Sequence, residues 1–418
     1  MKAVEKYLRS RKLSGPWLIE GECRNDFSGA VVIPALAEKD LFKTLGGLAE
    51  NPPDVLNEFL VLVVVNNRLD SRAEDKALNA ETLKQLKDFR ETIEHLNLAW
   101  VDAVSPGCEL PHKGGGVGMA RKIGFDLALE KLGCRASAVL VSLDADTLVR
   151  PDYLPALVSH FHDSSRPGGA VIPYCHQPGR TPAEERAIQR YELFLRSYVL
   201  GLSLAGSPYA FHTIGSAMAC RAKDYARIGG MNCRQAGEDF YFLQQLAKTC
   251  GVDEVDGTMV YPSARPSHRV PFGTGRSVSR VLAGELEAVL FYHHECFAVL
   301  KDWLDCIRGG WELDGPEIVS RAEKISPDLG TYLIKRNFVG IWTGLKRNHP
   351  GREALLKAFH VWFDALKTMK LIHHLSASPF PRMGPENMLQ GLFRWADLSP
   401  SSTIKEQLAI LRSYQIKN

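Results

Sequence analysis

The strongest constraint on the fold is a series of short apolar runs, rich in β-branched residues, that alternate with segments of helical spacing. Three of these runs are Gly29–Ala35, Phe59–Val65 and Ala138–Leu143. None shows the polar alternation of a half-exposed strand, which is typical of strands buried on both faces. Strands alternating with helices between residues 29 and 175 predict βαβ units and a mostly parallel central sheet, with helices on both of its faces.

The other elements are predicted from helix-breaking residues and from the spacing of the apolar residues. Helices are expected over 38–50, 80–96, 119–132 and from Pro151 onward, and further strands over 98–103 and 169–174. From about Arg276 to the end the spacing is mainly helical. We therefore expect a polar lead-in over 1–28, an α/β domain over 29–276 with halves 29–150 and 151–276, and a helical C-terminal subdomain over 277–418.

The composition narrows the class of protein. Hydrophobic residues make up 45% and charged residues 24% of the chain, which is typical of a globular protein. A formal net charge of +3 gives no overall basic field, so nucleic acid is not an expected partner. The nine cysteines are scattered without a C-x-x-C pair, which favours a reducing compartment.

We see no signal-peptide pattern in Met1–Leu13 and no run of about 18 apolar residues. The expectation is a cytoplasmic protein without a transmembrane segment. Peripheral contact with a membrane is compatible with this composition.

Two aspartates, Asp144 and Asp146, come directly after a predicted strand. Side chains alternate along an extended chain, so both carboxylates are expected on one side. Glu38 and Asn66 also fall at strand ends, where open α/β sheets bind ligands. Two carboxylates there could hold Mg²⁺ or Mn²⁺, which prefer oxygen ligands and leave positions for phosphate oxygens. The pattern is also compatible with solvated loop carboxylates.

A second acidic pair, Glu238 and Asp239, opens a helical stretch that runs to Lys248. Acidic residues in a first helical turn often only complement the helix dipole. Near a cleft, one of them could act as a general base that deprotonates an acceptor hydroxyl. Both are therefore candidate catalytic residues.

An irregular cationic stretch runs from Arg265 to Arg276 and contains His268 and Arg269. The imidazole of His268 could be a third metal ligand. The guanidiniums of Arg265, Arg269 and Arg276 could clamp phosphate oxygens through paired hydrogen bonds. A basic surface loop is the alternative interpretation.

A glycine-rich segment, Gly114–Gly118, precedes a predicted helix that carries Arg121 and Lys122. It resembles a turn that cradles phosphate at a helix N-terminus. The spacing matches neither a P-loop nor a dinucleotide-binding fingerprint, so neither of those functions is supported.

Together these motifs resemble the family 2 glycosyltransferases, which have the GT-A fold, a Rossmann-like, mostly parallel sheet flanked by helices. The resemblance covers about residues 29–276, and its blocks lie in the family's order. The blocks are Val31–Glu38, Gly118–Gly124, Ser142–Asp146 followed by Pro151–Leu154, and Gly215–Arg221 followed by Tyr225, Gly229, Gly230 and Gly237–Asp239.

The resemblance implies a role for each matched residue. Residues 29–150 would bind the nucleotide of a UDP- or GDP-sugar, and 151–276 the acceptor. Nucleotide contacts would come from Pro34, Ala35, Glu38, Asn66, Gly118, Arg121 and Asp144. Asp146 would bind the metal directly, with Asp144 near the ribose or a metal-bound water. Asp239 would be the base that Glu238 supports, and transfer would invert the anomeric centre.

Departures from the family pattern leave alternatives open. Asn66 or Asn67 stands where the family usually has an aspartate, and no Q-x-x-R-W motif follows Asp239, which disfavours a processive synthase. A retaining transferase similar to mannosylglycerate synthase, a non-catalytic nucleotide-sugar-binding protein and a nucleotidyltransferase remain as rivals. The sequence does not identify the acceptor. The apolar stretch Tyr191–Leu204 is interpreted as core in preference to an acceptor groove.

Overall fold

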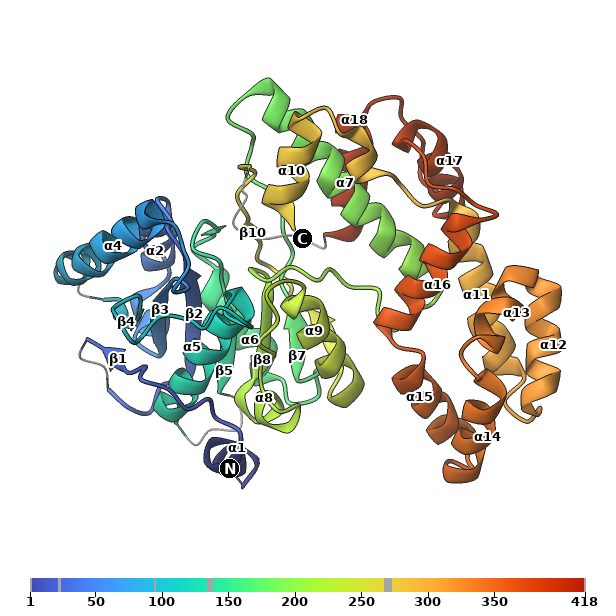
Figure 1. The fold of residues 1–418 in the computed structure, drawn as a ribbon, viewed down its shortest axis with the longest axis horizontal. Helices are drawn as coiled ribbons and strands as arrows, with labels where there is room; N and C mark the ends of the chain where they lie inside the picture. Colours follow the sequence, from blue (N-terminus) through green and yellow to red (C-terminus); the bar gives the residue numbers. More distant parts are fainter. Residues whose placement is uncertain (1, 22–23, 94, 134–137, 267–272, 417–418) are drawn as a thin grey trace. The chain divides into compact units, whose positions relative to one another are not determined.

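The structure is a computed structural model that describes residues 2–21, 24–93, 95–133, 138–266 and 273–416. It divides into two compact units (Figure 1). Unit 1 comprises Met1–Glu185, Thr213–Ser279 and Ile416–Asn418, and unit 2 comprises Arg186–His212 and Arg280–Gln415. Residues 186–212, which lie inside the 151–276 half drawn from the sequence, thus belong to the helical unit.

Unit 1 is built on an eight-stranded sheet with the order β1-β4-β3-β2-β5-β8-β7-β9. Its strands are β1 (Ile19–Glu20), β2 (Gly29–Ala35), β3 (Phe59–Asn66), β4 (Asn97–Ala103), β5 (Val139–Ser142), β7 (Gly169–Val171), β8 (Met218–Arg221) and β9 (Val252–Glu254). A second, two-stranded sheet pairs β6 (Leu148–Val149) with β10 (Val260–Tyr261).

The strands pair in parallel at the centre of the large sheet. β2 pairs in parallel with β3 and β5, β3 with β4, and β7 with β9. The pairs β1–β4, β5–β8 and β7–β8 are antiparallel. The predicted α/β fold, with a mostly parallel central sheet, is therefore confirmed.

Helices cover both faces of this sheet. On one face, alternate residues such as Val31 join Leu45, Leu86 and Leu157 in one buried cluster. On the other face, a methyl group added to Gly124 would overlap the side chains of Val32 in β2 and Val64 in β3. The helices of this unit are α1 (Lys2–Ser10), α2 (Leu41–Ala49), α3 (Pro53–Leu56), α4 (Ala73–Thr92), α5 (Val117–Lys131), α6 (Tyr153–His162), α8 (Ala222–Arg227) and α9 (Glu238–Thr249).

The N-terminal segment is more ordered than the polar lead-in expected from its sequence. Helix α1 buries Tyr7, whose hydroxyl donates to Asp126 of α5 at 2.7 Å, and Tyr225 of α8 donates to the same oxygen. The Lys122 ammonium lies 3.0 Å from the other carboxylate oxygen of Asp126. Gly230 leaves room for the ring of Tyr7, because a methyl group there would overlap its hydroxyl. Buried polar contacts, which local periodicity does not report, hold the segment in place.

Several element boundaries differ from those expected. Helix α4 begins at Ala73 instead of residue 80, and α6 begins at Tyr153, two residues after Pro151. In the region expected to be mainly helical, a 3₁₀ turn, η1 (Leu286–Val289), precedes α11 (His294–Gly309). Strand β5 ends at Ser142, so Asp144 and Asp146 lie in the turn that follows it and strand alternation does not extend to them.

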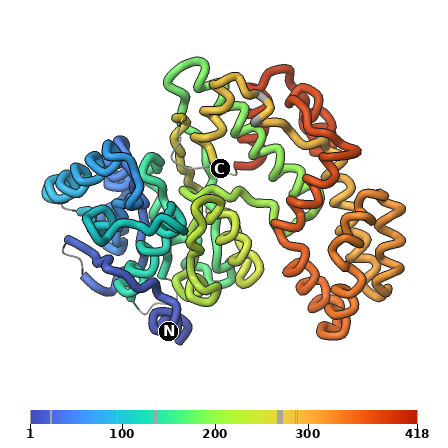
Figure 2. Tube along the Cα trace, viewed as in Figure 1, coloured from blue at the N-terminus to red at the C-terminus, as the bar shows by residue number. Residues whose placement is uncertain are grey.

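The regular elements of unit 2 in its described part are helices, apart from one isolated bridge between Phe291 and Met383, as predicted for the C-terminal region, and Figure 2 traces its path. Its helices are α11 (His294–Gly309), α12 (Gly315–Ile325), α13 (Pro327–Ile334), α14 (Phe338–Asn348), α15 (Arg352–Trp362), α16 (Ala365–Ala377), α17 (Pro385–Trp395) and α18 (Ile404–Gln415); α7 (Pro182–Leu204) and α10 (Thr274–Leu282) each cross between the two units. Leu193, Leu200 and Leu202 of α7 are buried in its core, which confirms the assignment of 191–204 to core.

A buried cluster of ion pairs joins α7 to α18 within unit 2. Glu192 of α7 accepts hydrogen bonds from Arg196 at 2.8 Å and from Arg412 of α18 at 2.7 and 2.8 Å. Across the residues that the structure describes, every helix is too short or too polar to cross a lipid bilayer.

Candidate active site

Arg121 of α5 joins the two acidic motifs. Its guanidinium donates to Asp144, in the turn after β5, and to Glu238, the first residue of α9. Its Nε also donates to the hydroxyl of Ser142 at 2.9 Å. The Arg121 side chain is only 2% exposed, whereas that of Asp144 is 36% exposed. The aspartate that follows the central strand is therefore connected through one buried cation to the acidic pair of α9.

The local chain leaves a defined space for this guanidinium. A methyl group added to Gly215 would overlap Arg121, so only glycine fits at that position without a shift. Gly237 has a φ of +69°, a left-handed conformation that glycine adopts without strain, immediately before α9 begins. Glu238 thus enters the helix at the point where Arg121 contacts it, and Asp239 follows as the next residue.

The pKa of Asp239 is raised towards neutrality. Burial, followed by the neighbouring charge of Glu238, raises the pKa of Asp239 to about 7, although Arg121 opposes the shift. Burial likewise raises the pKa of Glu238, and Arg121 again counteracts it. A carboxyl group with a pKa near neutrality can accept a proton in one step and release it in the next.

Arg265 brings together a second group of predicted residues. It lies after β10, and its Nε and Nη2 donate to Oδ2 of Asp146 at 3.3 and 3.0 Å. Its Nη2 also donates to Glu38, whose side chain is 4% exposed. Glu38, Asp146 and Arg265 are therefore in contact, although they are far apart in the sequence.

Gln177 belongs to this second group and was missed in the sequence. Its Nε2 donates to the backbone oxygens of Asp146 at 2.9 Å and of Tyr261 at 2.7 Å, and so holds the turn that carries Asp146 against β10. A glutamine in the loop after β7 belongs to no recognised sequence motif. Ser142 was also missed as a site residue. The one pattern that could have indicated it is its position two residues before Asp144.

The side chain of Asn66 is hydrogen-bonded to backbone oxygens. Its side-chain amide donates to the oxygens of Ala35 and Val64, both at 3.0 Å, and is 4% exposed. Pro34 and Ala35 are buried in β2. The turn after β2 is held by Asn79 of α4, whose Oδ1 accepts from the backbone nitrogen of Ala37 at 2.7 Å. These residues shape the ends of β2 and β3.

Two glycines of the glycine-rich segment pack against the loop before α9. A methyl group on Gly118 would overlap the backbone oxygens of Asn232 and Arg234, and one on Gly116 would overlap Gln235. The close approach permitted by these glycines is therefore between the start of α5 and the loop before α9. Arg276 is exposed in α10, while His268 and Arg269 lie outside the described residues.

The donor set fits a hard divalent cation in part. Asp144 and Asp146 are carboxylates of the kind that could supply oxygen ligands, and Mg²⁺ commonly uses one or two carboxylates together with water and substrate phosphates. Within the described ranges, no group of three or more His, Cys, Asp or Glu side chains is arranged to hold a metal ion. A bound cation would thus need further ligands from the substrate, from water or from residues outside those ranges.

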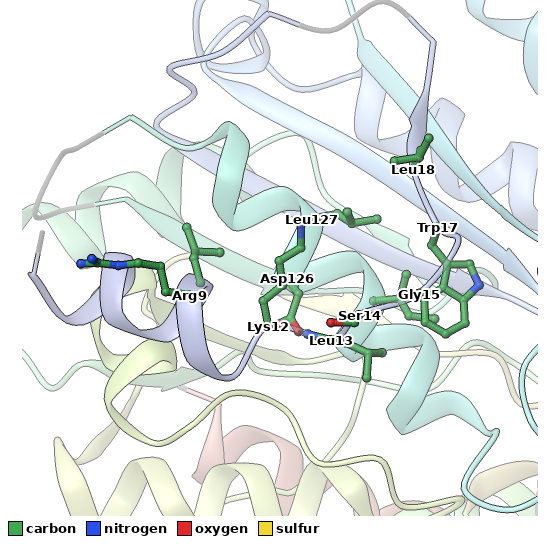
Figure 3. Close-up of a pocket in the computed structure, with 11 residues that line it drawn as sticks. Arg9, Lys12, Leu13, Ser14, Gly15, Trp17, Leu18, Asp126 and Leu127 are labelled. Atoms are coloured by element: carbon green, nitrogen blue, oxygen red, sulfur yellow. Dashed lines mark hydrogen bonds between the residues drawn. The ribbon is translucent and has the colours of Figure 1, made fainter.

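A separate surface cavity of about 350 Å³ lies beside α1 and α5 (Figure 3). Leu13, Trp17, Ile123 and Leu127 supply apolar walls, and Arg9 and Lys12 are basic residues that also line it. None of the candidate site residues lines this cavity.

Comparisons with known proteins give matches to solved structures. No protein-family model matches the sequence, and no curated protein matches it. Among the solved structures that match is TarS (residues 1–349) of S. aureus in complex with UDP-GlcNAc, with 13% identity over 73% of this chain and 86% of that chain, at a TM-score of 0.39.

Two further solved structures also match this chain. The mannosyltransferase PcManGT from Pyrobaculum calidifontis, in complex with GDP-Man and Mn²⁺, is 16% identical over 87% of this chain and 95% of its own, at a TM-score of 0.38. GalNAc-T7 with UDP, GalNAc and Mn²⁺ is 16% identical over 62% of this chain and 48% of its own, at 0.35. These three solved structures are what the chain resembles, at identities below 25% and TM-scores below 0.5. At such scores they carry no argument about activity or ligands.

Proposed function

We propose that this chain is a metal-dependent glycosyltransferase that moves a sugar from a nucleoside-diphosphate sugar to an acceptor hydroxyl with inversion. The observation that carries the proposal is the contact of Arg121 with both Asp144 and Glu238. It connects a carboxylate suited to the donor side with the neighbour of Asp239, whose pKa is about 7.

In the proposed reaction each acidic group has one task. Asp239 takes the proton of the acceptor hydroxyl as its oxygen attacks the anomeric carbon, and the bond to the diphosphate breaks. Glu238 holds Arg121 in place, and its negative charge helps to keep Asp239 basic. Asp144 and Asp146 would hold Mn²⁺ or Mg²⁺, which supplies charge neutralisation for the leaving diphosphate.

The remaining candidates are assigned to the donor. Glu38 lies with Asp146 at Arg265, and we assign it to the ribose or base of a UDP- or GDP-sugar. Pro34, Ala35 and Asn66 would shape the floor beneath the base through the buried ends of β2 and β3. Gly118 would act through packing at the start of α5. Arg276, Arg269 and His268 remain proposed phosphate or metal contacts.

The test is transfer or slow hydrolysis with a panel of UDP- and GDP-sugars, in Mn²⁺ and in a chelator. Asp146→Ala and Asp239→Asn are each expected to abolish turnover while the circular dichroism spectrum stays that of the wild type. Unchanged turnover by a folded Asp146→Ala protein would remove the metal role. The anomeric configuration of the product, read by NMR, decides between inversion and retention.

A further inference from the structure

We propose that Arg265 is an internal counter-cation that competes with the divalent cation for Asp146, so that metal and nucleoside diphosphate bind cooperatively. The inference rests on the proposed function, and it adds a rule for how the donor site is filled. Without this inference, Arg265 would be only one of several basic residues proposed to contact the phosphates of the donor.

The geometry places one cation between two carboxylates. Both Nε and Nη2 of Arg265 reach the same oxygen of Asp146, at 3.3 and 3.0 Å, and Nη2 also contacts Glu38. The side chains of Arg265 and Asp146 are 16% and 24% exposed, so solvent screens the pair only in part. The second oxygen of Glu38 accepts from the backbone nitrogen of Asp40 at 3.0 Å. Among the described residues, this guanidinium is a cationic partner that the two carboxylates share.

Charge then determines the order of binding. A divalent cation on Asp146 would lie close to the guanidinium and would compete with it for the same carboxylate. Two like charges at such a distance repel, most strongly where solvent is partly excluded. Metal alone is therefore expected to bind weakly to the wild-type protein, because the guanidinium that contacts Oδ2 of Asp146 opposes a second cation on the same carboxylate.

A diphosphate changes this balance. It offers Arg265 an alternative anionic partner with oxygens that a guanidinium fork can bind in pairs. When Arg265 turns from Asp146 to the diphosphate, it no longer competes with the cation for that carboxylate. By thermodynamic linkage, nucleotide must then tighten metal binding by the same factor as metal tightens nucleotide binding.

The experiment measures Mn²⁺ affinity by the EPR signal of free Mn²⁺, with and without UDP or GDP, and with a protein-free titration to correct for Mn²⁺ bound by the nucleotide. Wild-type protein, Arg265→Gln and Arg166→Gln are compared. Arg166 is the matched control, since it also lies between two carboxylates of unit 1, Asp253 at 3.4 Å and Asp256 at 2.9 Å.

We expect wild type and Arg166→Gln to bind Mn²⁺ weakly alone and roughly 10-fold or more tightly with the nucleotide, within the usual range of allosteric coupling. Arg265→Gln is expected to bind Mn²⁺ alone about 10-fold more tightly, with the coupling reduced below that of the wild type to the part that the direct attraction between Mn²⁺ and the diphosphate supplies. If Arg265→Gln does not melt cooperatively, Arg265→Lys is used, because lysine keeps the charge but cannot form the rigid fork; it should bind Mn²⁺ alone several-fold more tightly than wild type.

The outcomes separate the two proposals. Cooperative binding in the wild type that Arg265→Gln or Arg265→Lys leaves unchanged overturns the role of Arg265 and leaves the proposed function standing. Equal Mn²⁺ affinity with and without nucleotide overturns the role of Arg265 and also the charge neutralisation that the proposed function assigns to the metal. A wild-type protein that binds neither Mn²⁺ nor nucleotide overturns the proposed function, and the inference with it.

Discussion

The guanidinium of Arg121, on α5, donates to the carboxylate of Glu238 at the start of α9, and the two side chains are only 2% and 5% exposed. The pair joins two helices whose sequence positions are 117 residues apart. Because neither charge has good access to water, each depends on the other for its stability in the folded state.

Removing one partner should therefore cost more than removing both. Arg121→Met leaves Glu238 buried without its cation and is expected to lower the free energy of unfolding by about 3–5 kcal/mol. Arg121→Met combined with Glu238→Leu should recover part of that loss. Urea unfolding provides the measurement. Arg150→Met, which breaks an exposed ion pair with Asp152, serves as the control and should cost about 1 kcal/mol or less.

The rate of transfer should depend on pH through Asp239. Since its pKa is about 7 and the base must be ionised, kcat/KM is expected to rise with pH below 7 and to level off above it. A plot of kcat/KM against pH between 5 and 9 checks this. A rising limb with a midpoint near 4 would mean that Asp239 titrates as an ordinary surface carboxylate.

Asp239 should also make stability depend on pH. Its pKa is raised from 3.8 to about 7 in the folded protein, so the folded state holds a proton that the unfolded chain has released. Relative to Asp239→Asn, the wild type should lose stability as pH rises from about 4 to about 7, by no more than about 1.4 kcal/mol per pH unit. Thermal melts of both proteins at pH 5 and pH 8 test the sign: the advantage of Asp239→Asn should be larger at pH 8.

Tyr7 should contribute to stability through its hydroxyl. The group donates to Asp126 at 2.7 Å and accepts from Lys122 at 2.6 Å in a buried cluster. Tyr7→Phe is expected to lower the free energy of unfolding by about 1–3 kcal/mol, because it leaves buried partners incompletely bonded. Tyr414→Phe, at a side chain that is half exposed, should change it by less than about 0.5 kcal/mol. Equal effects of the two substitutions would show that α1 does not dock through this hydroxyl.

Replacing Ala37 with glycine should stabilise the folded protein. Its φ is +47°, a left-handed conformation that costs an alanine about 1–2 kcal/mol. Ala37→Gly is expected to raise the free energy of unfolding by about 1 kcal/mol, because glycine adopts that conformation without strain. Ala80→Gly in α4 gives the opposite sign, a loss of about 1 kcal/mol. Chemical denaturation of the two variants checks both signs, and a loss at position 37 would contradict the account.

The sequence by itself determined the core of the α/β unit. The run Gly29–Ala35 coincides with β2, and the runs at 59–65 and 138–143 contain β3 and β5 to within one or two residues. The reason is physical: strands buried on both faces must be apolar throughout, so their pattern is visible without knowledge of their neighbours. The acidic candidates at 144, 146, 238 and 239 could be selected in the same way, from their positions at strand and helix ends.

Only the tertiary structure decided which of these residues meet. Arg121 contacts Asp144 and Glu238, and Arg265 contacts Asp146 and Glu38, across separations of 23 to 227 residues that no local period records. The glycines at 116 and 118 pack against the loop before α9, although their spacing suggested a phosphate cradle. The role of a buried charge or a glycine depends on what packs against it, and that partner is supplied by the folded chain.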